Sequence, residues 1–263
     1  MDVQISGKVV LITGASEGIG AACAEVFRKR GARLSLAART ESRLQEVGRG
    51  EAVETAGDLT DGEVRRRVVE RTLERFGRLD ILINNAGVGL YGPASQAPLE
   101  TVRRMFELNV FAALELAQLV VPGMKERSGG AIVMVSSIAG RITLPWLGLY
   151  SASKAALDSV ADALRMELKP HLIQVTTVAP GYVTTGFQGH ALAGKPPAGL
   201  ARYQRYAITA EGCAEVIARG VERNARTVMA PRSGWIAVAA ARLFPRLVDR
   251  QLAGINHELE RGA

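Results

Sequence analysis

Tyr150 and Lys154 are the residues whose types and spacing could carry out chemistry. Residues four apart lie on one face of a helix, so Lys154 comes up beside Tyr150 if this stretch is helical, and alanines at 152, 155 and 156 favour a helix. A free phenol loses its proton only near pH ~10, whereas a neighbouring ammonium favours the phenolate. The pair could therefore transfer protons at neutral pH. The alternative is an exposed pair on an ordinary amphipathic helix, and the other motifs decide between the two.

A glycine-rich turn separates the first apolar run, residues 8–13, from the first helical pattern. Glycines allow a tight turn and let a pyrophosphate approach backbone N–H groups at the positive end of a helix. Strand, glycine turn and helix is the context in which this motif binds a nucleotide, although a purely structural turn is the alternative. We expect cofactor contacts from Gly14, Ser16, Gly18, Ile19 and Gly20.

The second predicted strand, residues 33–38, ends at Arg39 and Thr40, where the adenosine ribose of a dinucleotide would be recognised. An acidic residue there would bind the ribose 2′-hydroxyl, whereas an arginine can accept a 2′-phosphate, so Arg39 favours NADP(H) over NAD(H). Asp58 and Leu59 follow a weak third strand. Asp58 can accept a hydrogen bond from the adenine amino group, or it can cap the next helix.

Polar and turn-forming residues also follow the next three predicted strands, at 79–83, 131–135 and 172–178. A parallel sheet binds its ligands at the carboxyl ends of its strands, so these residues should meet in one place. The cofactor contacts expected from the first and third of these segments are Asn85, Ala86, Gly87, Pro180, Gly181, Val183 and Thr185.

Ser137 and Asn109 complete the set of candidate catalytic residues. The Ser137 hydroxyl could polarise a substrate carbonyl beside the phenol, or it could close a turn. Asn109 is the odd polar residue in a long helical pattern from 99 to 121, and a buried asparagine needs partners. It either joins the helix to a neighbour or kinks it around a water near Lys154.

Strands alternate with helices along the chain, which predicts an α/β protein with a doubly wound Rossmann fold. We expect about seven parallel strands with helices on both faces. No linker or repeat divides residues 1–263, so we expect one domain, with a C-terminal amphipathic helical extension at about 233–260 around Pro245. Residues 186–206 are rich in glycine, proline and alanine, which is typical of a mobile lid.

Composition excludes several classes of protein. The net charge of +7 comes from dispersed arginines and only 5% of residues are aromatic, so we do not expect nucleic-acid binding. Cys23 and Cys213 are too few for a disulfide framework. We expect no metal site. The polar N-terminus predicts neither a signal peptide nor an N-terminal anchor, and thus a cytoplasmic protein.

The motifs occur together, in order and at matching spacings, in a way that resembles the short-chain dehydrogenase/reductase family, from Gly7 to about Pro231. The matching motifs are Thr13-Gly-x-x-x-Gly18-x-Gly20, Asn84-Asn-Ala-Gly87, Ser137, Tyr150-x-x-x-Lys154 and Pro180-Gly181. The resemblance implies hydride transfer between nicotinamide C4 and a carbonyl or secondary alcohol carbon. One departure concerns Glu17, because NADP-binding relatives often have a basic residue there, so the strictness of NADP(H) over NAD(H) is open.

The same resemblance implies roles for the catalytic residues. Tyr150 is the proton donor and acceptor, Lys154 holds the nicotinamide ribose and lowers the pKa of the tyrosine, Ser137 orients the carbonyl, and Asn109 maintains a water that links Lys154 to solvent. It also implies that Val183 contacts the nicotinamide carboxamide, that Thr185 binds near it, and that residues 85–87 lie against the adenosine. A homodimer or homotetramer, paired through the helices that begin near 99 and 150, is a further implication.

The leading functional hypothesis is an NADP(H)-dependent reductase or dehydrogenase that acts on an apolar carbonyl or alcohol. The apolar preference rests on residues in loops expected to border the cleft: Leu90, Tyr91, Leu144, Trp146, Leu147 and Phe187. The alternatives are a 3-oxoacyl-[acyl-carrier-protein] reductase, which would need a shorter tail after Pro231, and a non-catalytic nucleotide-binding sensor or scaffold. The C-terminal helices could narrow the substrate entrance, join subunits or, as a minority hypothesis, lie on an anionic membrane.

Overall fold

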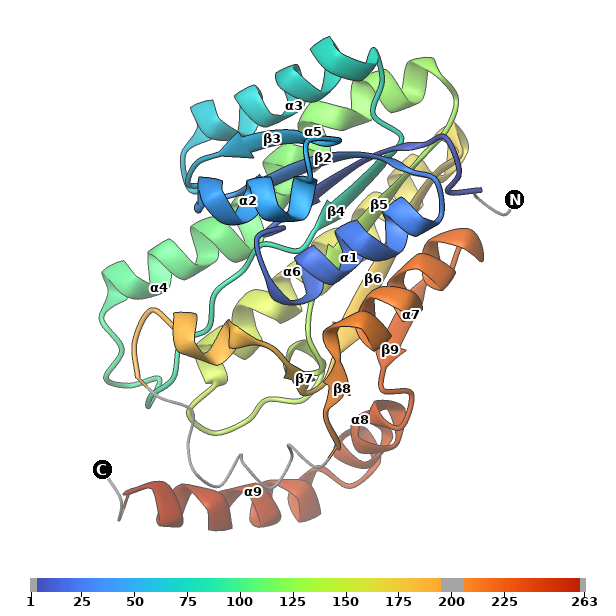
Figure 1. Cartoon of the computed structure of the whole chain (residues 1–263). Coiled ribbons are helices and arrows are strands. Elements are labelled where there is room, and N and C mark those ends of the chain that lie inside the picture. Colours follow the sequence, from blue (N-terminus) through green and yellow to red (C-terminus); the bar gives the residue numbers. More distant parts are fainter. Residues whose placement is uncertain (1–3, 195–205, 261–263) are drawn as a thin grey trace.

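A seven-stranded parallel sheet forms the centre of the computed structural model, which describes residues 4–194 and 206–260 (Figure 1). The strand order is β3-β2-β1-β4-β5-β6-β9, and every neighbouring pair is parallel. The order reverses between β1 and β4, and such a reversal opens a crevice at the carboxyl ends of the strands. The strands of this sheet are β1 (Val9–Thr13), β2 (Arg33–Ala38), β3 (Val53–Ala56), β4 (Ile81–Asn84), β5 (Gly130–Val135), β6 (Ile173–Pro180) and β9 (Thr227–Ala230).

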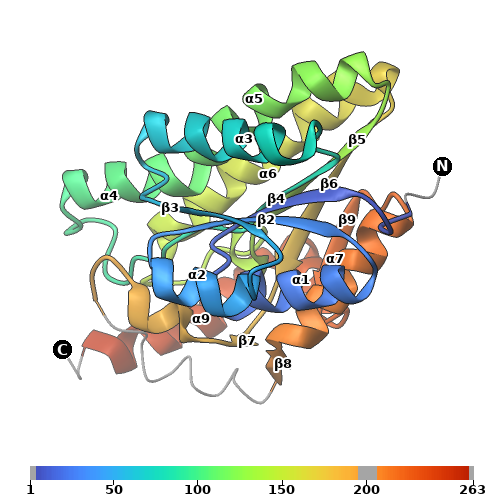
Figure 2. The same ribbon diagram turned by 45° about the horizontal axis from the view of Figure 1, so that its top comes forward.

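Helices cover both faces of the sheet, as Figure 2 shows, and the predicted doubly wound α/β fold is confirmed. Successive side chains of a strand point to opposite faces, so Val10 and Ile12 enter one core layer while Leu11 enters the other. All three are fully buried, which explains why β1 is a continuous apolar run. The helices of the first layer are α1 (Gly18–Lys29), α2 (Glu41–Gly48) and α7 (Ala210–Glu222), and those of the second are α3 (Gly62–Phe76), α5 (Ala112–Glu126) and α6 (Gly148–Leu168).

The long helix expected at 99–121 is not regular. The chain forms α4 (Leu99–Phe106), one π-helical turn, η1 (Glu107–Phe111), and then α5. Asn109 lies in the π turn, where its side chain bonds to other segments instead of facing solvent. The whole stretch from 99 to 126 is long and apolar enough to cross a membrane by length and composition, but a core helix passes the same test, and α5 packs against α3 and the sheet.

Other elements were not predicted from the sequence. Helix α2 is one, and a two-stranded parallel pair, β7 (Val183–Thr184) with β8 (Ile208–Thr209), is another. In the segment expected to be a lid, η4 (Gly186–His190) is a short 3-10 helix, while residues 195–205 of that expectation lie outside the described part of the chain. The expected helices on either side of Pro245 are α8 (Gly234–Leu243) and α9 (Pro245–Glu260).

Candidate active site

A cavity of about 850 Å³ lies at the carboxyl ends of the parallel strands, where the strand order reverses. It brings together nearly all of the site residues predicted from the sequence. Gly20 and Asn109 do not line it: Gly20 packs behind the glycine turn, and Asn109 is buried behind Gly87. The predicted residues that line it are Gly14, Ser16, Gly18, Ile19, Arg39, Thr40, Asp58, Leu59, Asn85, Ala86, Gly87, Ser137, Tyr150, Lys154, Pro180, Gly181, Val183 and Thr185.

The turn between β1 and α1 has the geometry expected of a phosphate-binding loop. Gly14 and Gly18 have φ values of 64° and 56°, in the left-handed region that favours glycine. A Cβ at Gly20 would lie 2.1 Å from Gly14 O, so only glycine allows this close approach. Glu17 precedes the first turn of α1 without a side-chain hydrogen bond to its N–H groups, which leaves them directed at the cavity end of the helix.

Residues at the end of β4 hold this turn in place. Thr13 Oγ1 accepts hydrogen bonds from the backbone N–H groups of Asn85 and Ala86, both at 3.0 Å. The Asn85 side-chain amide donates to Thr13 O at 2.9 Å and to Gly14 O at 3.2 Å. Asn85 therefore positions the glycine turn, a function that the sequence did not reveal.

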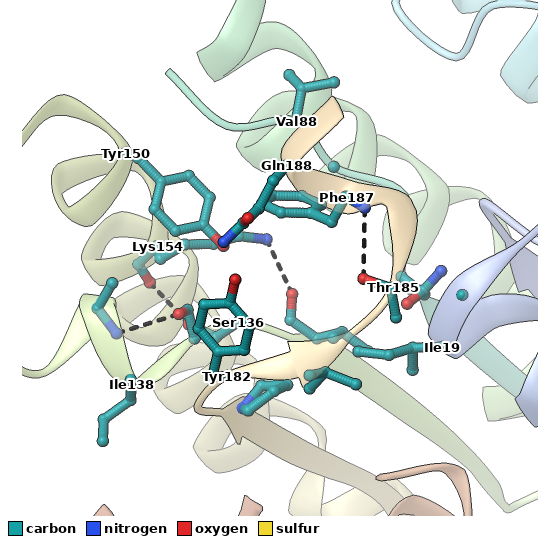
Figure 3. A pocket seen from close by; sticks show the side chains of 18 of the residues that line it. Ile19, Val88, Ser136, Ile138, Tyr150, Lys154, Tyr182, Thr185, Phe187 and Gln188 are labelled. Carbon is teal, nitrogen blue, oxygen red and sulfur yellow. Dashed lines mark hydrogen bonds between the residues drawn. The ribbon is translucent and has the colours of Figure 1, made fainter. Parts of the chain in front are cut away.

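Tyr150 and Lys154 lie one turn apart on α6 and face the same space, together with Tyr182 and Gln188 (Figure 3). Both are buried, with 8% and 3% of their surface exposed. Lys154 Nζ donates a hydrogen bond to Val135 O at 2.9 Å and lies 5.9 Å from the centroid of the Tyr150 ring. The sequence-based expectation of a phenol and an ammonium on one helix face is therefore matched by the geometry.

The electrostatics of the pair differ from the expectation that Lys154 lowers the pKa of Tyr150. Burial raises the pKa of the Tyr150 phenol, and a hydrogen bond with Ser137 acts in the opposite direction. Burial also lowers the pKa of Lys154 to about 8, while the nearby carboxylate of Asp158 partly opposes that decrease. Desolvation is thus the stronger influence on both groups in this geometry.

Asn109 joins three segments around the catalytic helix. Its Oδ1 accepts from Val88 N at 2.9 Å, and its Nδ2 donates to Val88 O at 3.0 Å and to Ser153 Oγ at 3.1 Å. Ser153 in turn donates to Tyr150 O at 2.7 Å. Of the two alternatives drawn from the sequence, the structure shows the first: Asn109 joins its own helix to the Val88 segment and to α6 by hydrogen bonds. The π turn is the local distortion of the helix at this residue.

The end of the cavity next to β2 and α2, where the adenosine is expected from the sequence, is lined by Arg39 and Arg43. Arg39 is exposed at the end of β2 and lines the cavity. Arg43, on α2, also lines it and forms an ion pair with Glu17 at 2.7 Å. Glu17 further contacts His190 Nε2 at 2.6 Å. The Glu17 carboxylate, which would repel a 2′-phosphate, is therefore paired with the Arg43 guanidinium. This ion pair was not expected from the sequence, because α2 was not predicted.

Asp58 lines the same end but does not cap α3. Its Oδ1 accepts a hydrogen bond from Thr60 N at 3.0 Å, whereas the cap is Asp61, which accepts from Glu63 N. The capping alternative for Asp58 is therefore wrong. Burial acts to raise the pKa of the Asp58 carboxyl, yet the hydrogen bonds from Thr60 and the charges of two nearby arginines hold it below its ordinary value.

The opposite end of the cavity is apolar. Phe187 from η4 lies against Tyr150, with ring centroids 5.9 Å apart, and Tyr91, Leu144 and Leu147 line the same region. The other two residues of the predicted apolar set, Leu90 and Trp146, are not among those that line it. Side chains that the sequence analysis did not assign to the cleft complete the wall: Ile138, Ile142, Ile236, Ala237, Ala240, Val248 and Leu252.

The cavity fits a dinucleotide on its own geometry. A Cβ at Gly87 would lie 3.1 Å from Asn109 Oδ1 and 3.4 Å from Lys154 Nζ, so this glycine lets both side chains pack closely against the backbone at the cavity. The backbone N–H groups at the start of α1 have no side-chain cap and could bind a pyrophosphate. The Arg39 guanidinium could bind a phosphate on the adenosine ribose. Together with Tyr150 and Lys154 on α6, these features are typical of a nicotinamide-dependent oxidoreductase.

Comparison with known proteins agrees with this class. Residues 8–195 match the family model described as short chain dehydrogenase, and the chain therefore belongs to the short-chain dehydrogenase/reductase family of oxidoreductases. It is 37% identical over 194 residues to the mouse (Mus musculus) protein dehydrogenase/reductase SDR family member 7B, an alignment that covers 70% of this chain. The chain spans about 60% of the length of that relative.

Solved structures of two reductases are also similar. L-sorbose reductase from Gluconobacter frateurii, complexed with NADPH and L-sorbose, is 33% identical with a TM-score of 0.78, over 87% of this chain and 97% of that one. The 3-ketoacyl-(acyl-carrier-protein) reductase from Brucella melitensis, complexed with NADH, is 27% identical with a TM-score of 0.78, over 86% and 97%. A nicotinamide cofactor is thus common to both neighbours.

Proposed function

We propose that this protein is an NADP(H)-dependent oxidoreductase that interconverts an apolar carbonyl compound and its secondary alcohol, with Tyr150 as the proton donor and acceptor. The observation that carries the proposal is the position of the Tyr150 phenol. It lies beside Lys154 and Ser137 in a cavity that continues, on one side, to the glycine turn and, on the other, to an apolar wall.

Each catalytic residue has a task that follows from its contacts. A bound nicotinamide supplies or accepts the hydride at the reacting carbon. Tyr150 Oη gives its proton to the carbonyl oxygen in reduction and takes the hydroxyl proton in oxidation. Ser137 Oγ, which hydrogen-bonds the phenol, is placed to bond to the same oxygen and orient it. Lys154 provides an ammonium at the same place below its pKa of about 8.

NADP(H) and an apolar substrate are the finer parts of the proposal. The two similar reductases hold NADPH and NADH, so the cofactor is inferred from this chain's own residues. Arg39 offers a guanidinium at the ribose end, and Glu17 is matched by Arg43 at 2.7 Å. The substrate end is lined by Leu144, Leu147 and other apolar side chains, which favour a ligand of low polarity.

Assembly and location are also proposals. Large apolar side chains lie exposed on the outer faces of the π turn and α6, with Phe111 at 53% and Met166 at 73%. A two-fold contact through these helices would bury them, so we infer a homodimer or homotetramer. A cytoplasmic location is retained from the sequence.

A tyrosine substitution tests the function. Tyr150→Phe removes the proton donor with little change in volume, so kcat should fall by about 10²–10⁴-fold while the Kd for NADPH stays within about twofold. Tyr91→Phe is the matched control, because it removes a hydroxyl from the same cavity and keeps the ring that forms part of the apolar wall. Its kcat should stay within about threefold of that of the unchanged chain.

The assay follows nicotinamide absorbance over a panel of ketones, aldehydes and alcohols, with a 3-oxoacyl thioester among them. A Tyr150→Phe variant that kept more than about a tenth of kcat would remove the tyrosine from the mechanism. Preference for the thioester would favour the carrier-protein reductase. Tight NADPH binding with no turnover of any compound would favour a nucleotide-binding sensor.

A further inference from the structure

Helices α8 and α9 carry exposed apolar side chains that do not line the cavity. We define the tail patch as Leu243, Phe244 and Leu247, which are 71%, 60% and 67% exposed. Ile236, at the rim of the cavity, is 73% exposed. Single exposed apolar residues are ordinary, but here several large ones gather within twelve positions of the chain, and such a gathering marks an interaction surface.

Other residues of the same helices pack on the domain or line the cavity. Val238 is 3% exposed and packs with Ala179 and Met229. Ala240 on α8 and Leu252 on α9 line the cavity. The helix pair therefore packs on the domain and lines the cavity, as one hypothesis from the sequence expected, while the tail patch is left exposed.

Positive charge accompanies the tail patch. Arg242, Arg246 and Arg250 recur at intervals of four residues and are all exposed. Arg232 adds a fourth positive charge, and Asp249 is the one acidic side chain in the described stretch 231–253. Arg242 lies on α8, and Arg246 and Arg250 lie on α9. Exposed apolar side chains accompanied by arginines are the composition of helices that lie in the interface of an anionic membrane.

We propose that the tail patch docks this protein on the surface of an anionic lipid bilayer, with the mouth of the cavity, marked by Ile236, next to the lipid. Helices α8 and α9 have 10 and 16 residues and are about 15 and 24 Å long, so neither crosses the hydrocarbon core of about 30 Å. The helices therefore lie in the plane of the interface. A lipophilic substrate can then enter the cavity without crossing water, which extends the proposed function to membrane-dissolved carbonyl compounds and alcohols.

A second copy of the chain is a poorer partner for this surface. A two-fold contact places the same patch on both sides, so Arg242, Arg246 and Arg250 of the two copies would be brought together. Like charges at such a contact repel each other, whereas each arginine near an anionic bilayer strengthens binding by about fivefold.

Vesicle co-sedimentation of the full chain tests the proposal without any turnover. The vesicles are phosphatidylcholine alone or phosphatidylcholine with about 30% phosphatidylserine. We expect binding to the anionic vesicles that weakens as salt is raised. The triple variant Arg242→Gln, Arg246→Gln and Arg250→Gln should bind about a hundredfold more weakly.

A matched control uses the same residue type and spacing elsewhere on the surface. Arg67, Arg71 and Arg75 are exposed and recur every four residues along α3, so their change to Gln removes equal charge from another face. This control should bind within about threefold of the unchanged chain. Equal losses in the two triple variants would show non-specific attraction and overturn the proposal, as would absence of binding to the anionic vesicles.

The apolar part is tested by the double variant Leu243→Glu and Phe244→Glu, neither of which lines the cavity. It should lose vesicle binding and keep kcat/KM for a water-soluble ketone, while kcat/KM for a long-chain ketone dissolved in vesicles falls about tenfold. If the unchanged chain instead self-associates in sedimentation and this variant does not, the patch is a subunit contact and the membrane proposal is wrong.

Discussion

Arg39→Ala is the substitution that most directly tests how the adenosine end of the site selects its cofactor. Arg39 is exposed at the end of β2 and lines the cavity close enough to Asp58 to influence the pKa of that carboxyl. A charge-assisted hydrogen bond to a phosphate contributes roughly 1.5–3 kcal/mol, and the exposure of this side chain places it near the lower end. The Kd for NADPH should therefore rise at least about tenfold.

Binding of NADH should change by less than about twofold, because it lacks the phosphate that Arg39 would contact. Both constants can be measured from the fluorescence of the reduced nicotinamide. Arg223→Ala, at an exposed arginine outside the cavity, is the control and should alter neither constant. An unchanged ratio of the two constants in Arg39→Ala would refute the reasoning and place the phosphate elsewhere, with Arg43 as the next residue to change.

Three further predictions concern the catalytic helix, the glycine turn and the assembly. Asp158→Asn removes a negative charge that raises the pKa of Lys154, so this pKa should fall below its present value of about 8. The loss of kcat at alkaline pH should then begin at a lower pH. A loss that begins at the same or a higher pH would contradict this prediction. Gly20→Ala places a Cβ 2.1 Å from Gly14 O and should cost about 2 kcal/mol, or about 6 °C in Tm, whereas Gly129→Ala, whose nearest neighbour would be at 3.9 Å, should be close to neutral. Analytical ultracentrifugation at micromolar concentration should show a dimer or tetramer, and a monomer would exclude pairing through the outer faces of η1 and α6.

Most of the fold could be predicted because local sequence and tertiary position agree. Strand β2 was predicted with its observed bounds, Arg33–Ala38, since most of its residues are buried and apolar and the run ends at the polar Arg39. Helix α2 was missed because only Leu44 and Gly48 of its residues are buried, which leaves no apolar periodicity to detect.

The sequence predicted which residues line the site, but it did not predict most of the contacts between them. Few other residue types could replace the glycines, the tyrosine or the lysine at their positions, and their spacing can be read directly from the sequence. The contact of Glu17 with Arg43 and His190 joins residues from three segments, which no spacing reveals. The raised pKa of Tyr150 follows from burial, to which Phe187 contributes from far along the chain, so it also depends on the folded structure.

The bonds between the end of β4 and the glycine turn have a consequence for the thermodynamics of cofactor binding. Because Asn85 already holds Thr13 O and Gly14 O, the turn has little conformational entropy left to lose when a pyrophosphate arrives. Fixing the backbone of a mobile loop on binding would otherwise cost about 1–2 kcal/mol for each residue that becomes ordered. The glycine turn is therefore preorganised, and a pyrophosphate bound there as proposed would lose less free energy to ordering of the protein than it would at a mobile loop.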